Sequence, residues 1–358
     1  SEMGAEENRI RKIGQLRSIV SMNEEVKNEL NYSLKVVELA TSLLLEDLDD
    51  SLSLDHHSQL WSALKWSIDR AKGSTKDNIS TTNTASSIAS AFSSLMNLLY
   101  LLDSEYDLPS GKAPSPFMSS PSHSLKKGKA SDEGKISILS YLAVRVGDIF
   151  RYKKDIAASA QWYRYAINID PSNGEGWNQI GILSAQLGSP LDAVYSYYRA
   201  TFTTNPSTIA SSNILTVLDA HLDEEPDDET DEDSFVLHTL ALIHYLRPLS
   251  PPLLAHLPSL LSSPRRLLPF IAALSSLDHH STTSSSLLNL FQQGLHIFKQ
   301  EIEDIQSFDS STLATLNLYS RVLPSQSIDS ILEGRSREET DLFQMDHFIC
   351  SPLSSSSQ

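Results

Sequence analysis

Hydrophobic residues recur along most of the chain at the three- and four-residue spacing of an α-helix. Three N-terminal stretches show the pattern clearly, with apolar positions at Val36, Val37, Leu39, Leu43, Leu44 and Leu48, at Leu60, Trp61, Leu64 and Ile68, and at Ile88, Phe92, Leu95, Leu98, Leu99 and Leu102. No convincing run alternates with the two-residue period of a strand. The chain is therefore predicted to be all-α, with few or no strands.

Two segments interrupt this periodicity. Residues 107–133 are rich in Ser, Pro, Gly and Lys and carry too little apolar surface to pack, so they are predicted to form a long, flexible surface loop. Residues 223–233 hold nine acids in eleven positions, and such a block repels itself and stays solvated as a linker. An N-terminal domain is therefore expected over residues 5–222, with about nine helices.

A second helical region is predicted over residues 234–335, followed by a Ser-rich tail at 336–358. Its expected helices form a hairpin array and span Phe235–Leu246, Pro251–Leu261, Leu267–Leu277, Ser286–Gln306 and Ser311–Leu323.

The middle of the chain contains an internal repeat. Gly147 and Gly181 are 34 residues apart, which is the period of the tetratricopeptide repeat. Further positions match on the same frame: Ala143 with Trp177, Val146 with Ile180, Ser159 with Ala193, Tyr163 with Tyr197, Ala166 with Ala200, and Pro171 with Pro206, which comes one residue late. Small residues let two antiparallel helices approach closely, large ones fill the groove between them, and proline ends the second helix. Two helical hairpins are therefore predicted, with flanking helices completing the stack.

Composition excludes several classes of function. The formal net charge of −17 argues against direct nucleic-acid binding, which needs a basic face to displace counterions. The longest apolar run, Leu267–Leu277, falls well short of the roughly 20 residues that span a bilayer, so no membrane contact is expected. The single cysteine, Cys350, permits no internal disulfide and favours a reducing compartment.

No pattern of residues predicts catalysis or metal binding. The paired histidines are adjacent in sequence, so they do not face one another on a helix, and no acid or cysteine lies at ligand spacing. Neither a phosphate-binding glycine loop nor a nucleophile elbow is present. We therefore predict a protein that is not an enzyme and has no catalytic residues, metal or cofactor.

The segment from Val146 to Tyr152 reads Val-Gly-Asp-Ile-Phe-Arg-Tyr, and it resembles the Gly-Asp-x-x-Arg-Tyr segment of 14-3-3 proteins. It is even more similar to the same segment of the 14-3-3-like Smg-five, Smg-six, Smg-seven and Est-one family of nonsense-mediated mRNA decay adaptors. Similar motifs follow at Trp162–Ala166, Pro171–Gly174, Asn178-Gln179, Asp192–Arg199 and Asn205-Pro206. The resemblance is close over residues 136–214, fainter over 30–105 and absent after 234. The Pro171–Gly174 stretch favours the Smg-seven branch.

The resemblance implies a site for a phosphorylated peptide. Arg151 and Tyr152 match the Arg-Tyr pair that holds phosphoserine in 14-3-3 proteins, and Lys65 matches the first basic position on an earlier helix. Lys72, two turns further on, matches the second, with Arg70 as a rival for that role. Asn178 matches an asparagine that fixes the backbone of the bound peptide.

These residue types suit a phosphate. A phosphoserine carries about −1.5 to −2 charges and three acceptor oxygens, which an arginine fork and lysine ammonium groups complement. Converging cations repel one another, so Asp69 and Asp148 are expected to neutralise them. The alternative is structural, because an arginine before a tyrosine on a helix is most often a surface ion-pair partner, and a tryptophan such as Trp66 most often packs in a core.

The resemblance implies a non-enzymatic adaptor in nonsense-mediated mRNA decay. Its expected partners are phosphorylated Ser or Thr segments of the Upf-one RNA helicase, a paralogous Smg protein in a Smg-five/Smg-seven type heterodimer, and phosphatase or mRNA decay factors. A cytoplasmic location is expected, and a nuclear location is the alternative. Two alternatives remain: a phosphate-independent tetratricopeptide scaffold for an unmodified peptide, and a telomerase-associated protein of the Est-one type.

Overall fold

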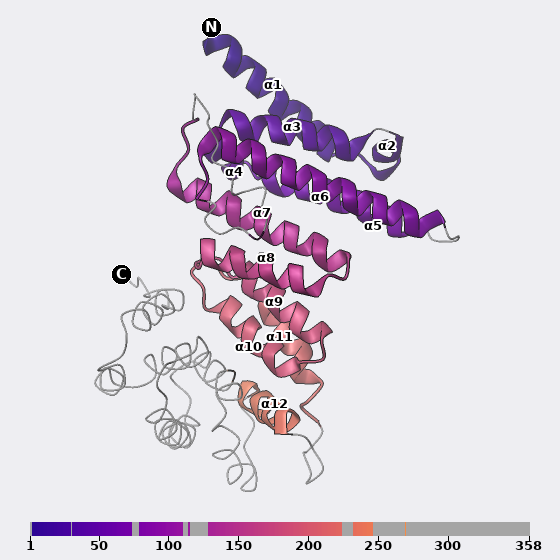
Figure 1. Cartoon of the computed structure of the whole chain (residues 1–358), viewed down its shortest axis with the longest axis vertical. Coiled ribbons are helices and arrows are strands. Elements are labelled where there is room, and N and C mark those ends of the chain that lie inside the picture. The colour runs from indigo at the N-terminus through magenta and orange to yellow at the C-terminus, as the bar shows by residue number, and fades with distance from the viewer. Residues whose placement is uncertain are drawn as a thin grey trace, which may run out of the picture. The chain divides into compact units, whose positions relative to one another are not determined.

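A computed structural model describes residues 2–29, 31–73, 79–109, 114, 128–223, 232–245 and 269. In these residues the regular structure is entirely helical, apart from one isolated bridge between Asn173 and Asn205. The helices, drawn in Figure 1, are α1 Glu2–Val20, α2 Glu24–Glu29, α3 Tyr32–Glu46, α4 Leu48–Ser53, α5 His56–Gly73, α6 Ile79–Tyr106, α7 Asp132–Tyr152, α8 Ile156–Ile169, α9 Glu175–Gln186, α10 Pro190–Thr201, α11 Ala210–Asp219 and α12 Glu232–His244. The predicted all-α fold is confirmed.

The chain divides into two compact units, Ser1–Asp170 and Pro171–Gln358. In the first unit α3 packs on α1 and α5, α5 on α6, α6 on α7, and α7 on α8, which gives the stack seen in Figure 1. The predicted apolar stripes supply its core, because Val36, Leu43 and Leu64 are nearly or completely inaccessible to solvent. The described chain has eleven helices before residue 222, more than the nine expected, since two of them, α2 and α4, span only six residues each.

Helix α6 revises one expectation from the sequence. Its segment Asn83–Tyr106, with a mean hydropathy of 1.4, is long and apolar enough to cross a membrane by length and composition. Sequence reasoning missed it because serine, threonine and asparagine interrupt the apolar run. The helix packs on α3, α5 and α7 and buries Leu95, Leu98, Leu99 and Leu102. Packing within the first unit therefore accounts for this apolar face.

The two predicted helical hairpins are formed by α7 with α8 and by α9 with α10. Gly147 lies against the ring of Tyr163, where an added Cβ would come within 2.5 Å of Cε1. Gly181 lies in the same way against Tyr197, with a corresponding distance of 2.4 Å. The same close approach thus recurs after 34 residues, as the spacing predicts, while the assignment to the tetratricopeptide class stays a prediction.

In the second unit, α10 packs on α9, α11 and α12. The Pro171–Gly174 stretch and the Asn205-Pro206 stretch meet there, because Asn205 donates its backbone N–H to the carbonyl of Ser172 over 2.8 Å and accepts from the N–H of Gly174 over 2.9 Å. Two motifs that lie far apart in the sequence therefore close the ends of the same hairpin.

Several domain predictions fall largely outside the described residues. Most of the 107–133 loop, the helices expected after Leu246 and the tail at 336–358 are among them. The helix expected at Phe235–Leu246 is present as α12, which begins at Glu232. The last two acids of the predicted linker, Glu232 and Asp233, therefore lie in the first turn of a helix, where negative charge interacts favourably with the helix dipole and stabilises the helix.

Replacing Gly147 by Ala should destabilise the first unit. The new methyl group would overlap Tyr163, and overpacking of this kind costs about 1–3 kcal/mol. Gly14→Ala is the matched control, because no atom lies within 4 Å of its added Cβ and the change should raise helix stability by about 0.5–1 kcal/mol. Chemical denaturation of both variants measures the difference, and equal free energies of unfolding would contradict the close approach of α7 and α8.

Candidate anion-binding site

Helix α5 presents a line of alternating charges near its C-terminal end. Lys65, Asp69 and Lys72 are four and three residues apart, so they share one face of the helix. Asp69 lies between the two lysines, with Oδ2 2.5 Å from Lys65 Nζ and Oδ1 3.7 Å from Lys72 Nζ. The hydrogen bond with Asp69 raises the pKa of Lys65, so this lysine stays charged at neutral pH. All three side chains are more than two-fifths exposed and are therefore accessible to a ligand.

The C-terminal part of α7 holds a buried carboxylate between two arginines. Asp148, whose side chain is only 3% exposed, accepts from Arg145 NH1 over 2.9 Å and from Arg151 NH2 over 3.2 Å. A buried charge needs such partners, because leaving it unpaired is strongly destabilising. Arg145 is also held over the rings of Trp61 and Tyr141. The ion pair with Asp148 therefore fixes the position of the Arg151 guanidinium.

Tyr163 of α8 completes this network. Its hydroxyl donates to Asp148 Oδ1 over 2.7 Å and accepts from Arg151 Nε over 3.2 Å. Burial of the phenol raises the pKa of Tyr163, and Asp148 raises it further, so the hydroxyl remains a donor. Burial alone would lower the pKa of Arg151, but Tyr163 and Asp148 outweigh it and raise the pKa. The repeat pattern places Tyr163 only in the groove between two helices, and its position sixteen residues after Gly147 is the one sequence signal for this contact.

Cationic side chains from α5 and α7 both lie near the ring of Tyr152. Lys72 Nζ lies 4.3 Å from the centre of its ring, and Arg151 Cζ lies 5.3 Å from the same point. Burial raises the pKa of Tyr152, Asp148 raises it further, and the charges of Arg151 and Lys65 oppose this increase. The cluster made by Lys65, Asp69, Lys72, Arg145, Asp148, Arg151, Tyr152 and Tyr163, called the α5–α7 cluster below, has four cations against two carboxylates. Its net charge of +2 complements a phosphate dianion in a chain whose total charge is −17.

Two of the predicted site residues lie elsewhere. Arg70 lies over the ring of Trp66, at 5.3 Å, and the indole N–H of Trp66 donates to Glu24. Arg70 therefore lies on a different face of α5 from Lys72, the other candidate for the second basic position. Asn178 of α9 is completely buried in the second unit, where its Oδ1 accepts from Asn213 Nδ2 over 2.9 Å. The peptide-binding role of both residues stays a prediction.

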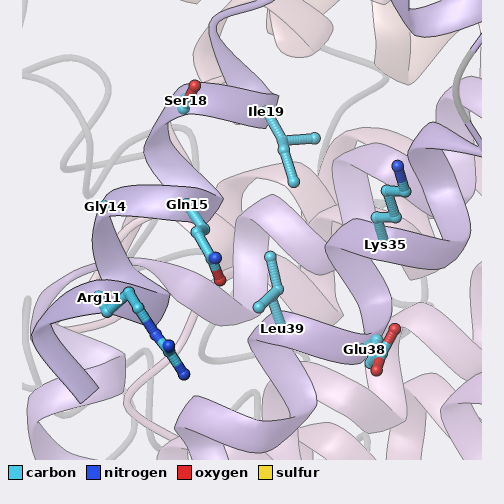
Figure 2. Close-up of a pocket in the computed structure, with 8 residues that line it drawn as sticks. All are labelled: Arg11, Gly14, Gln15, Ser18, Ile19, Lys35, Glu38 and Leu39. Carbon is cyan, nitrogen blue, oxygen red and sulfur yellow. The ribbon is translucent and has the colours of Figure 1, made fainter. Parts of the chain in front are cut away.

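A groove between α1 and α3 has a volume of about 620 Å³. Figure 2 shows it with Gln15, Ile19 and Leu39 between the two helices, and its cations Arg11 and Lys35 come with the acid Glu38. None of the predicted site residues lines it. In the described parts of the chain no group of three or more His, Cys, Asp or Glu side chains has the geometry of a metal site.

A family model described as the Est1 DNA/RNA binding domain matches residues 159–345, which is more than half of the chain. The chain belongs to the Est1 DNA/RNA binding domain family. The resemblance to the Smg and Est-one proteins is thereby confirmed, but its limit at residue 234 was wrong, because the match continues for about another hundred residues. The Est1-family match begins after Tyr152, so it covers Tyr163 but none of the other residues of the α5–α7 cluster.

Relatives and solved structures agree with the family. The nonsense-mediated mRNA decay factor SMG7 of Danio rerio is 31% identical over 93 residues, and the telomerase-binding protein EST1A of the same organism is 34% identical over 79 residues. These matches cover 26% and 20% of this chain but only 8% and 5% of those proteins. Each aligned segment is thus a small part of a much longer relative.

The similarity of fold extends over most of the chain. The structure of the C. elegans SMG5–SMG7 complex matches with a TM-score of 0.69 and 17% identity, covering 91% of this chain and 86% of the solved one. The crystal structure of Est1 and Cdc13 matches with a TM-score of 0.55 and 14% identity, covering 87% and 74%. The 14-3-3-like helical fold of this Est1-family chain is therefore confirmed.

Replacing Tyr163 by Phe should lower the free energy of unfolding by about 1–2 kcal/mol, because Asp148 and Arg151 lose a buried hydrogen-bond partner. Tyr197→Phe is the matched control at the equivalent position of the second hairpin, where the described residues give the hydroxyl no hydrogen bond that would be lost. Urea titration of the two variants measures the contrast, and equal losses would show that the Tyr163 hydroxyl contributes nothing to the network.

Proposed function

We propose that the chain is a non-enzymatic adaptor whose α5–α7 cluster binds phosphoserine or phosphothreonine in a partner protein. The observation that carries the proposal is the meeting of Lys72 from α5 and Arg151 from α7 at the ring of Tyr152, with Lys65 linked to Lys72 through Asp69. The three oxygens of a phosphate can together accept hydrogen bonds from several cations, and a tyrosine hydroxyl can add a neutral donor.

The difference in exposure between the two helices supports this role. The lysines are point charges on flexible stems and are almost half exposed, whereas Arg151 is 18% exposed and held by Asp148 and Tyr163. A fixed guanidinium loses little conformational freedom on binding, so it gives orientation, and the lysines add charge. This division of roles suits a compact dianion better than an extended, unmodified peptide.

The wider assignment rests on the relatives. We propose a role in nonsense-mediated mRNA decay, in which the cluster holds a phosphorylated segment of the Upf-one helicase. The proposed location is the cytoplasm, and the nucleus is the alternative. A paralogous Smg protein is the proposed dimer partner, and phosphatase or decay factors are the proposed recruits. The similarity to SMG7 and to the SMG5–SMG7 complex motivates these partners.

A telomerase-associated role is the second candidate. It is favoured by the similarity to EST1A and to the structure of Est1 and Cdc13. The family description also names DNA and RNA binding, against which the net charge of −17 argues. Fluorescence-polarisation titrations with single-stranded telomeric DNA and with a phosphopeptide separate these roles, since only the phosphopeptide should bind in the micromolar range.

Charge reversal at Lys65 tests the site. Lys65→Glu should weaken binding of a serine-phosphorylated helicase peptide by at least about tenfold, equivalent to ~1.4 kcal/mol, and should leave the melting temperature nearly unchanged because the side chain is half exposed. Lys35→Glu, in the groove between α1 and α3, makes the same charge change as a control. Isothermal titration with phosphorylated and unphosphorylated peptides gives the readout, and equal affinity for the two peptides in the wild type would favour the phosphate-independent scaffold.

The pH dependence provides a separate test. Affinity should rise between about pH 5 and 7, because the second pKa of the phosphate is about 6 and the dianion is the preferred ligand. It should then stay constant to about pH 9, because the pKa values of Lys65 and Tyr152 are both raised above their ordinary values near 10. Burial lowers the pKa of His56 and His57, so acid favours unfolding, and circular dichroism must confirm the fold at each pH. A fall in affinity from pH 5 to 7 would contradict dianion binding.

A further inference from the structure

Asp69 is the anion that lies between the two lysines of α5. One carboxylate oxygen lies 2.5 Å from Lys65 and the other 3.7 Å from Lys72, so the two cations of this helix share a single internal anion. Asp148 differs, because it is buried between arginines and a tyrosine and cannot move without leaving charges unpaired. Asp69 is 46% exposed and can move into solvent by rotating its own side chain.

The exchange of one anion for another depends on their charge. Exposed ion pairs three or four residues apart on a helix contribute little to stability, so a stronger anion displaces Asp69 at small cost. A ligand carboxylate replaces one monoanion by another and gains almost nothing at the lysines. A phosphate brings up to one additional charge and one additional oxygen, which is a further acceptor for a cation such as Arg151.

We propose that Asp69 is a built-in counter-anion that sets the threshold for binding at the α5–α7 cluster and so excludes unphosphorylated acidic segments. This inference rests on the proposed phosphopeptide function and specifies which residue provides its selectivity. The chain itself shows why such a threshold is useful, because residues 223–233 contain nine acids. A cation cluster without an internal competitor would attract acidic segments of this kind regardless of phosphorylation.

The test uses the full chain and three helicase-derived peptides that are identical except for Ser, phosphoserine or Glu at one position. Asp69→Asn keeps the size of the side chain and removes its charge. It should bind the phosphopeptide about fivefold or more tightly than the wild type, because a like charge next to the ligand is removed. It should also bind the Glu peptide measurably, whereas wild-type binding of that peptide should be undetectable in the same titration.

Glu38→Gln on α3 is the matched control, because it removes one negative charge from the groove between α1 and α3 and should leave all three affinities unchanged. A second variant, Asp69→Ser, should behave like Asp69→Asn, and the melting temperatures of all variants establish that they are folded. The two gains should shrink when the salt concentration is raised, since they are electrostatic in origin.

The outcomes separate the two proposals. If the wild type prefers the phosphopeptide but Asp69→Asn binds it no more tightly, then Asp69 positions the lysines and the counter-anion role is overturned, while the phosphopeptide function stands. A gain for the phosphopeptide without any binding of the Glu peptide overturns the exclusion role. A wild type that binds the Ser and phosphoserine peptides equally overturns the phosphopeptide function, and the inference with it.

Discussion

The first unit depends on one buried carboxylate. Asp148 is almost inaccessible, and it accepts hydrogen bonds from Arg145, Arg151 and Tyr163. Removing any one partner leaves the other charges partly unpaired, so the group behaves as a unit in which each member fixes the others. Through Tyr163 this network joins α7 to α8, and through Arg151 it reaches the surface beside Tyr152 and Lys72. Packing of a helical hairpin and orientation of a cation are therefore consequences of the same interaction.

Much of the fold follows from sequence periodicity. The spacing of Gly147 and Gly181 predicts two hairpins with equivalent close contacts, and both contacts are present because only glycine leaves room for the ring of Tyr163 or Tyr197. The seven-residue spacing of Lys65 and Lys72 likewise places both lysines on one face of α5. Both predictions depend on the regular geometry of an α-helix, which can be inferred from the spacing of residues in the sequence.

Contacts between distant segments were harder to predict. The choice between Lys72 and Arg70 depended on which face of α5 is directed toward α7, and that is set by packing on α3 and α6. Asn178 matches its motif, yet its side-chain oxygen accepts a hydrogen bond from Asn213, a residue from a helix that the resemblance did not connect with it. Arg145 was missed although it lies three residues before Asp148, which is a regular ion-pair spacing on a helix. The family match also extends beyond residue 234, where no short motif that resembles the family was identified in the sequence.

The two hairpins separate the scaffold from the chemistry. At the positions of α9 that correspond to Asp148 and Arg151, 34 residues later, the chain has Ile182 and Ala185. The second hairpin keeps the glycine and the tyrosine but has no buried carboxylate for the tyrosine to bind, and its arginine, Arg199, instead lies on α10 over Trp177. Two similar helical hairpins thus carry different side chains, and of the two only the first has a buried carboxylate paired with arginines. A structural match at low identity consequently establishes the helical scaffold, whereas the ligand must be argued from the few polar residues that the first hairpin does not share with the second.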